Sequence, residues 1–481
     1  MGLISTDRRN NSSIPTGSVL DLKRREFHMR RLIVLLLSLV PLHLPLNVMF
    51  ADEVWQAGVA KTVITPPTPM WMSGYASRTK PAEGTIHDLY AKALAISDPA
   101  GHKILIVTLD LVGIDRTTSK TICEQLVDKH GLQRSGITIS TSHTHSGPVV
   151  GRNLMSMYSL DDENKRLVTE YTQFLNDSIL KISADAFANL EPATLQFGSS
   201  QATFAVNRRN NREPDVPALR AAGQLVGPVD HDVPLLVVRA ADGSLRTVLF
   251  GYACHATVLG GMDWCGDWPG FAQLEIERRH PETTAMFIAG CGADQNPLPR
   301  KTVELAAAYG NQMADSIDRA LAGPMQPVNG TLRTSYREID LAFDQLPSKE
   351  QIEADLKSEN VYIARRAVHL LDAISRDGEL SATYPYPVQM LRLGDLHIVT
   401  LGGEVVVDYA LRLKSELPGS TVWIAGYCND VMAYIPSVRV LQEGGYEGES
   451  AMIYYGLPTK WSAAVEDHIV RSVKELAEET K

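Results

Sequence analysis

The stretch GITISTSHTHSGP, residues 136–148, joins a short apolar and β-branched run to two histidines that are one residue apart. A run of this kind, bounded by glycine and proline, is typical of a buried strand. Alternate residues of an extended segment point to the same side, so His143 and His145 are expected to reach one cavity. Three interpretations are open at this point: a metal site, a catalytic pair, or histidines that are hydrogen-bonded in a core strand.

Similar apolar runs recur along the chain, and several are followed by segments with helical periodicity. The runs predict strands within residues 103–112, 234–240, 246–253, 284–290, 395–403 and 421–426. Helical periodicity is found around residues 165–190, 268–280, 302–321, 348–376 and 405–416, and residues 460–481 read as a closing helix. We therefore expect an α/β fold of the mixed α+β kind, with large mixed β-sheets covered by helices.

The first 51 residues differ in character from the rest of the chain. Residues 29–51 have two arginines, an apolar run and then a small residue before acidic ones, which is the layout of a secretory signal peptide. Pro41 and Pro45 weaken the alternative of a membrane span. We expect residues 1–51 to be a leader, residues 52–481 to form a single domain, and the mature protein to be exported, periplasmic or extracellular, with no stable membrane span.

Composition narrows the class of protein further. The chain of 481 residues has 44% hydrophobic and 21% charged residues, which is typical of a globular protein. A net charge of −10, without any basic block, argues against a nucleic-acid partner. The five cysteines show no CxxC spacing, so neither a zinc knuckle nor a disulfide framework is indicated, and at most Cys254 and Cys265 could pair.

Polar side chains follow the predicted strands. They are Asp110, His143, His145, His255, Asp294, Glu404 and Asp430. Strand ends in layered α/β proteins open into clefts where distant residues converge, so one shared site is expected. Two histidines with a carboxylate are a ligand set that suits catalytic zinc. Asp267 is expected to cap the helix that follows it, and His87 and His231 lie in loop-like contexts outside this ligand set.

The order of several motifs resembles a known family, the neutral/alkaline non-lysosomal ceramidases. The resemblance covers nearly all of residues 52–481 and rests on GVAKTVITPP, STSHTHSGP, VNRR, CHATVLGG, GCGADQNP and NDVMAYIPS, which occur in this order. It implies the fold of the catalytic domain of that family and a zinc-dependent hydrolase that cleaves a linear amide bond.

The resemblance also implies roles for individual residues. His143, His255, Glu404 and Tyr434 would bind one Zn²⁺ per chain, while His145 and Arg208 would hold or polarise the amide carbonyl of the substrate. From the residues alone, a strand tyrosine packed under a loop is the alternative for Tyr434, and composition favours a surface arginine for Arg208, which lies in the polar run NRRNNRE.

The segment GCGADQNP departs from the family pattern. Ceramidases carry a catalytic serine before the proline here, whereas this chain has Asp294, Gln295 and Asn296. A covalent acyl-serine route at this position is therefore excluded, and attack by metal-activated water is expected instead. Asp294 is expected to act as general base or, alternatively, as a turn residue, and Gln295 and Asn296 to hydrogen-bond the substrate.

The second departure concerns length. Family members usually carry a β-sandwich domain after the catalytic one, which we do not expect here, so a long-chain ceramide is in doubt as substrate. We expect an exported zinc-dependent amidohydrolase that cleaves an N-acyl amide of a small-molecule or lipid-like substrate. A zinc-dependent ester or lactone hydrolase, and a catalytically silent binding protein with the same fold, stay open as alternatives.

Overall fold

The computed structural model describes residues 54–417 and 421–481. The expected signal peptide, residues 29–51, lies outside these ranges. Within them, no helix has the length and apolar character needed to cross a membrane. The single-domain expectation for residues 52–481 stays a prediction.

The larger of two main sheets contains mixed parallel and antiparallel strands. Its order is β11-β9-β8-β6-β1-β3-β4-β5, with β13 paired to β6. Only the outer pairs β11·β9 and β4·β5 are parallel. The strands are β1 (Trp55–Val63), β3 (Tyr90–Ser97), β4 (Lys103–Leu109), β5 (Ile137–Thr141), β6 (Glu191–Gln201), β8 (Asp232–Ala240), β9 (Leu245–Tyr252), β11 (Thr284–Ala289) and β13 (Gln326–Pro327).

The second main sheet has the order β14-β15-β16-β18 and packs face to face on the first. The apolar core between the sheets includes Leu94, Ile106 and Leu249 of the first sheet, and Leu391 and Trp423 of the second. Close packing of these side chains excludes water from the interface of the sheets. The strands are β14 (Leu332–Ala342), β15 (Thr383–Leu393), β16 (Leu396–Leu401) and β18 (Thr421–Ala425).

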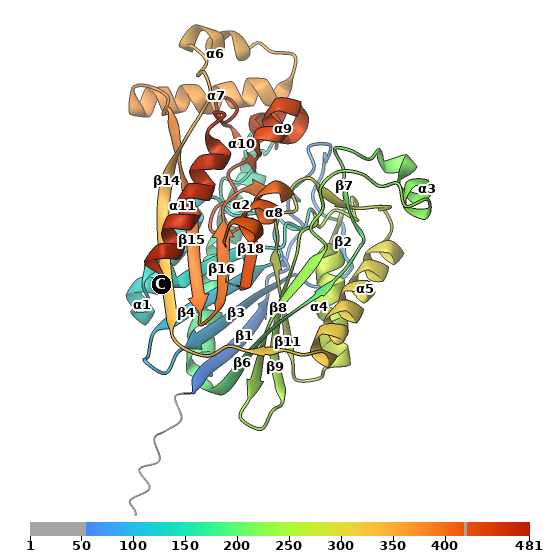
Figure 1. Ribbon diagram of the computed structural model, residues 1–481. Coiled ribbons are helices and arrows are strands. Elements are labelled where there is room, and N and C mark those ends of the chain that lie inside the picture. Colours follow the sequence, from blue (N-terminus) through green and yellow to red (C-terminus); the bar gives the residue numbers. More distant parts are fainter. Residues whose placement is uncertain (1–53, 418–420) are drawn as a thin grey trace, which may run out of the picture. The chain divides into compact units, whose positions relative to one another are not determined.

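Helices cover the outer face of each sheet, so that four layers follow one another (Figure 1). The first sheet is covered by α1 (Arg116–His130), α2 (Asp162–Ala188), α4 (Asp267–Arg279) and α5 (Val303–Ala322). The second is covered by α8 (Val407–Glu416) and α11 (Val465–Glu479). Shorter helices are α3 (Val216–Ala221), α6 (Lys349–Asp355), α7 (Val361–Asp377), α9 (Val438–Glu443) and α10 (Met452–Tyr455). The expected fold class, mixed sheets covered by helices, is confirmed.

One predicted helix differs from the structure. The region 348–376 contains two helices, α6 and α7, instead of one. Ser348 begins α6 with a capping box, and Asn360 begins α7 by accepting a hydrogen bond from the Tyr362 amide. The second N-cap satisfies amide groups of a new first turn, which explains why the helix is interrupted before residue 361.

Short pairings at one end of the two sheets hold the loops that carry the candidate site. Isolated bridges between Ser140 and Cys428 and between Gly290 and Ala425 tie the sheets together. Four short strands form two further ladders nearby: β7 (Ala205–Asn207) pairs with β12 (Gln295–Pro297), and β17 (Glu404–Val405) pairs with β19 (Tyr434–Ile435). A separate ladder joins β2 (Gly84–Thr85) to β10 (Asp263–Trp264). The loops after β5, β9, β16 and β18 are thus fixed by backbone pairing.

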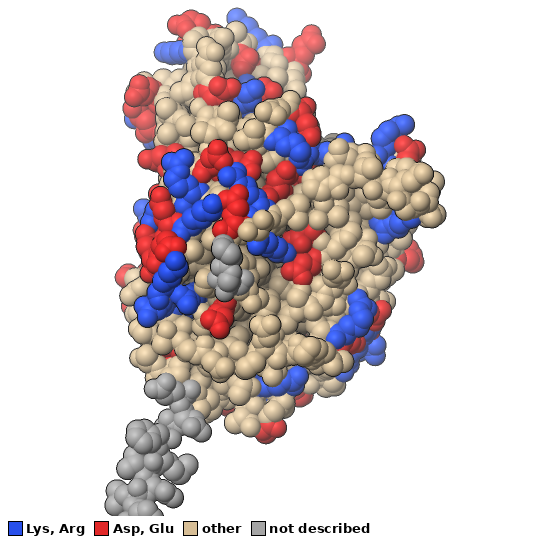
Figure 2. Space-filling view, in the orientation of Figure 1, with Lys and Arg blue, Asp and Glu red and all other residues tan. Residues whose placement is uncertain are grey.

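Charged side chains of both signs alternate on the face shown in Figure 2. Around α8, α9 and α11 many of them pair, for example Arg412 with Glu416 and Glu466, and Arg439 with Asp408 and Glu443. Exposed pairs of this kind contribute little to stability individually, about 0–1 kcal/mol. Their alternation leaves no broad field of one sign on this face.

Candidate metal centre

His143 lies directly after β5, and its side chain has a fixed tautomer. Its backbone has a φ of 60°, a left-handed conformation that is uncommon for a residue with a Cβ. The ring Nδ1 lies 2.6 Å from the carbonyl oxygen of Val112. A carbonyl only accepts, so Nδ1 carries the hydrogen and Nε2 presents a free lone pair. This is the arrangement in which a histidine binds a metal through Nε2.

His255 follows β9 and has the same arrangement. Its Nδ1 donates to the carbonyl oxygen of Gly292 at 2.7 Å, which leaves the Nε2 lone pair free. Burial, reinforced by the positive charge of Arg208, lowers the pKa of His255 to about 4. The ring is therefore neutral at physiological pH, as a metal ligand has to be.

Glu404 brings a carboxylate between the two histidines. Its Oε2 lies 3.1 Å from His143 Nε2 and 3.2 Å from His255 Nε2, and all three side chains are buried. The second oxygen, Oε1, accepts a hydrogen bond from the Tyr455 hydroxyl. Oε2 thus faces the Nε2 atoms of both histidines.

The donor set fits a bound cation. Three buried acceptor atoms that face one another without a donor between them cost folding free energy. Glu404 Oε2 is one of them, since it has no hydrogen-bond donor among the described residues. The distances from Glu404 Oε2 to the two histidine nitrogens, 3.1 and 3.2 Å, are close to ~3.3 Å, the edge of a tetrahedron with metal–ligand distances of ~2.0 Å. Zn²⁺ at the centre would satisfy all three acceptors.

Tyr434 completes the predicted ligand set in space. It is the register partner of Glu404 in the β17–β19 ladder, so the two side chains start from adjacent backbone positions. Its hydroxyl lies 3.3 Å from His255 Nε2 and accepts a hydrogen bond from Arg208 Nη2 at 3.1 Å. Burial, with the charge of Glu404, raises the pKa of Tyr434 well above its ordinary value. The phenol is therefore neutral even with Arg208 beside it, unless a metal ion is bound there too.

The His145 side chain also reaches the predicted ligand atoms, as the alternation of side chains along an extended segment predicts. Its Nε2 lies 3.1 Å from His143 Nε2, and its Nδ1 is buried without a partner. The ligand atoms of His143, His145 and His255 all lie within 4.8 Å of one another, so a set of three histidines is geometrically possible too. We favour Glu404 over His145 as the third ligand because its Oε2 is close to both other histidines, and His145 is more exposed.

Arg208 lies beside the centre and not on the surface. It follows β7, donates from Nε to Glu447 Oε1 at 2.8 Å and from Nη1 to Asn296 Oδ1 at 3.2 Å, and contacts the Tyr434 hydroxyl. Burial would lower its pKa, but Tyr434 and Glu447 raise it well above the ordinary value. A permanent positive charge is thus held within hydrogen-bonding distance of one predicted ligand.

The segment GCGADQNP, which departs from the family pattern, contacts Arg208 through Asp294 and Asn296. The Asp294 carboxylate is buried and accepts from the Val407 amide at 3.0 Å and from Asn207 Nδ2 at 3.1 Å, and burial raises its pKa. Gln295 is also buried, with Nε2 donating to the carbonyl of Pro228 at 3.3 Å and Oε1 unpartnered. These contacts favour positioning roles for both side chains, whereas their catalytic and substrate-binding roles stay predictions.

The other strand-end candidates lie apart from these contacts. Asp267 accepts from the amides of Val258, Leu259 and Trp268, so its carboxylate holds the start of α4 and the preceding loop. The remaining candidates bond elsewhere: Asp110 to the Tyr90 amide, His87 to Cys265, His231 to the Ala205 carbonyl and Asp430 to Tyr384. All five cysteines are free thiols and buried, so Cys254 and Cys265 do not pair.

Several residues at the centre escaped the sequence reasoning. Tyr455 bonds to Glu404, Glu447 holds Arg208, and the Tyr75 ring packs against the edge of His145 with centroids 4.7 Å apart. Tyr75 lies in the segment MSGYA and Glu447 in the segment YEGES, but neither segment has a spacing that specifies a role. Tyr455 has no signal in the sequence at all.

Comparisons with known proteins place the chain among known relatives. The family described as neutral/alkaline non-lysosomal ceramidase, N-terminal, matches residues 55–310. The neutral ceramidase of Mycobacterium tuberculosis is 21% identical over 85% of this chain and 74% of its own length. The neutral ceramidase of Drosophila melanogaster is 22% identical over 62% of this chain and 40% of its own length.

Two solved structures share the fold. The structure described as "Ceramidase complexed with C2" has a TM-score of 0.68 and 18% identity, over 89% of this chain and 75% of that one. Neutral ceramidase from Pseudomonas aeruginosa has a TM-score of 0.67 and 19% identity, over 89% of this chain and 74% of that one. The family match covers more than half of the chain, and the chain belongs to the neutral/alkaline non-lysosomal ceramidase family.

Proposed function

We propose that this chain is an exported, zinc-dependent amidohydrolase that cleaves an N-acyl amide. The observation that carries the proposal is the meeting of His143 Nε2, His255 Nε2 and Glu404 Oε2 at 3.1–3.2 Å, with both histidine tautomers fixed by backbone carbonyls. Family membership supports hydrolysis of an amide bond in a ceramide-like substrate. Export rests on the leader-like residues 29–51 alone.

We assign the metal to His143, His255, Glu404 and Tyr434. When bound, zinc supplies Lewis-acid polarisation of a carbonyl and makes water more acidic. Tyr455 contributes by donating to Glu404 Oε1, which orients the carboxylate so that its other oxygen faces the histidines.

His145 and Arg208 are assigned to the substrate. His145 is neutral, because burial and the neighbouring His143 lower its pKa well below the ordinary value, so its ring offers the substrate a neutral hydrogen-bonding group. Arg208 offers forked donors to a carbonyl oxygen, and Glu447 and Asn296 hold its guanidinium in place. Asp294 fixes this region through the Val407 amide and its own carbonyl, which accepts from the Arg208 amide at 2.9 Å.

The test combines metal content with a substrate panel. Elemental analysis of the purified chain should find about one zinc, strongly reduced in His143→Ala and Glu404→Ala, while Arg208→Gln should keep the metal and lose turnover. The panel pairs N-acyl amides with esters of the same acyl group. Turnover of the esters alone would move the assignment to an ester or lactone hydrolase. Metal binding without any turnover would favour the silent binding protein, and absence of metal would overturn the proposal.

A further inference from the structure

Two cavities share Arg300 as a lining residue, and both adjoin the metal centre. The first has a volume of about 370 Å³ and is lined by Tyr75, whose ring packs against His145, and by residues 257–261. The second has a volume of about 470 Å³ and is lined by Arg208, which contacts a predicted ligand. A substrate at the metal centre can therefore extend into either cavity and reach Arg300.

Lys301 follows Arg300 and lines the first cavity. Its φ is 94°, an uncommon conformation that costs about 1–3 kcal/mol for a residue with a Cβ. Its amide donates to the carbonyl of Val258 at 2.7 Å, which ties it to the segment that follows His255. The loop that leads away from a predicted ligand thus maintains the strained backbone, and Lys301 is held at the wall of the cavity.

The cationic groups of this region are open to solvent and have donors without acceptors. The Arg300 guanidinium binds Glu213 Oε2 through Nε and Nη2, whereas its Nη1 has no acceptor among the described residues. Lys301 Nζ lies 3.8 Å from Glu213 Oε1, beyond hydrogen-bonding distance. The Arg300 and Lys301 side chains are 24% and 74% exposed, so a ligand can reach both.

These two cations share one carboxylate. A hydrogen bond from Arg300 lowers the pKa of Glu213, so this carboxylate is ionised at neutral pH. Asp267 also acts on Arg300 electrostatically, but its carboxylate is buried, accepts three amide hydrogens and lines neither cavity. Among the described residues, the first cavity has no acidic side chain in its wall. One positive charge on this wall therefore stays unmatched.

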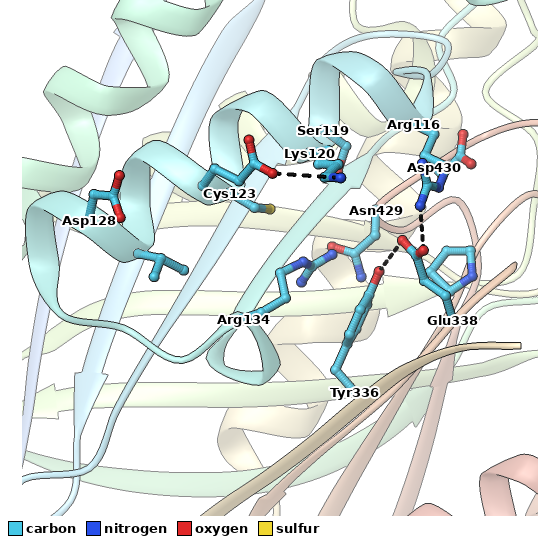
Figure 3. A pocket seen from close by; sticks show the side chains of 13 residues that line it. Arg116, Ser119, Lys120, Cys123, Asp128, Arg134, Tyr336, Glu338, Asn429 and Asp430 are labelled. Carbon is cyan, nitrogen blue, oxygen red and sulfur yellow. Dashed lines mark hydrogen bonds and ion pairs between the residues drawn. The ribbon is translucent and has the colours of Figure 1, made fainter. Parts of the chain in front are cut away.

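The cavity between α1 and β14 differs in this respect (Figure 3). Arg116 binds Glu338 at 2.5 Å, and the Arg134 guanidinium stacks over the Tyr336 ring at 3.9 Å. Burial raises the pKa of Asp430 to about 8, so this carboxyl is mostly protonated at pH 7. The other acidic residues of that wall then equal the basic ones in number, and no net charge selects a ligand.

We propose that the amide substrate carries one carboxylate, as an N-acyl amino acid does, and that Arg300 and Lys301 bind it. This inference rests on the proposed function and names its substrate class. The fork of an arginine binds a carboxylate through parallel hydrogen bonds, and a lysine adds a point charge. A monoanion matches the single unmatched charge, whereas a phosphate monoester brings about two negative charges. An uncharged amide leaves both cations in water.

The test compares hydrolysis of matched substrates that differ in charge. N-hexanoyl conjugates of glycine, 4-aminobutanoate and 6-aminohexanoate are each paired with the corresponding primary amide, so that three distances between amide bond and carboxylate are sampled. For at least one length, we expect kcat/KM of the acid to exceed that of its amide by about tenfold or more, and added salt should reduce the preference. The double variant Arg300→Gln, Lys301→Gln should lose the preference.

Two single variants have different expected effects on the preference for the acid. Glu213→Gln removes the shared carboxylate and should increase the preference by about threefold or more. Lys349→Gln is the matched control, because Lys349 Nζ also lies near one glutamate, 3.9 Å from Glu353 Oε1, and lines neither cavity. The preference should change by less than about twofold in this control, since an exposed pair of this kind contributes little.

Equal kcat/KM for every acid and its amide, or an unchanged preference in the double variant, overturns the inference and leaves the proposed function intact. If the parent hydrolyses none of the conjugates, the proposed function fails, and equilibrium binding decides the inference. Calorimetric titration of the parent should then still show about tenfold tighter binding of an acid than of its amide. The absence of that difference, or tighter binding of N-hexanoylethanolamine phosphate than of every acid, overturns the inference.

Discussion

Replacement of Glu404 by glutamine should have opposite effects on the metal-free and the metal-loaded protein. In the metal-free chain, the amide oxygen can keep the hydrogen bond from Tyr455, and the amide nitrogen then points at His143 Nε2 and His255 Nε2. Both nitrogens are acceptors, so the variant gains donors where Glu404 Oε2 had none. Each net hydrogen bond contributes about 0.5–1.5 kcal/mol.

In the loaded chain the same change removes a charged ligand. Zinc at a free concentration 100 times its Kd stabilises a protein by about 2.7 kcal/mol. For roughly 430 folded residues, the entropy of unfolding is about 0.9 kcal/mol/K, so this gain corresponds to about 3 °C in Tm. Glu404→Gln should lose most of this gain, whereas its Tm in excess chelator should equal or exceed that of the parent.

Thermal unfolding with zinc and with chelator, for parent and variant, gives the four values needed. Glu447→Gln is the matched control, since Glu447 is a buried carboxylate that binds Arg208 and Arg209 and touches no predicted ligand. The reasoning is refuted if Glu404→Gln in chelator melts well below the parent, or if zinc raises both melting temperatures equally.

Three further predictions test individual contacts. Gly74→Ala should lower kcat/KM at least about tenfold with zinc content unchanged, because a Cβ there would lie 2.5 Å from Cγ of His145 and the backbone φ is +97°; steady-state kinetics with elemental analysis checks this. Asp294→Ala should destabilise the chain by about 1–3 kcal/mol in chemical denaturation, since it leaves two buried donors without acceptors. The folded pKa of Asp430, about 8, lies above the unfolded value, so its stabilising effect is complete below pH 4 and is lost as the pH rises to 8. Asp430→Asn should therefore raise the free energy of unfolding relative to the parent by up to about 1.4 kcal/mol per pH unit across this window, and equal stability curves from pH 4 to 8 would contradict it.

The metal centre was predictable to the extent that its residues follow apolar runs. His143, His255 and Glu404 stand directly after strands whose hydrophobic content identifies them, and strand ends at one edge of a layered protein meet. Tyr434 had no such signal and came from the family resemblance alone. Tyr455 was missed because it lies on the short helix α10, and its contact with Glu404 depends on how that helix packs.

The elements that were missed have sequences at odds with their structure. Strand β3 is YAKALAIS, whose alanines favour a helix, yet it is buried in the middle of the first sheet. Strand β15 contains Pro385 and Pro387, which ordinarily argue against an inner strand. Helix α1 was overlooked because it is largely polar, and even its buried face includes Thr118 and Ser119. Tertiary packing outweighs local preference in all three elements.

The cavity lined by Arg116, Tyr336 and Asp430 could not be predicted from the sequence for the same reason. Its walls are α1, which local patterns do not reveal, and the segment of β14 that carries Tyr336 and Glu338, about two hundred residues away. Asp430 was noted as a strand-end carboxylate, and that context suggested the metal centre. The structure instead turns its side chain toward Tyr384 and its carbonyl toward Gly403.

The loop after β18 lines this cavity and also contacts the backbone next to Glu404. The Gly403 amide donates to Asp430, the Gly403 carbonyl accepts from the Tyr427 amide at 2.9 Å, and Tyr434 follows as a predicted ligand. Tyr427 and Asn429 have φ of 55° and 65°, so the loop holds uncommon backbone conformations that its neighbours must maintain.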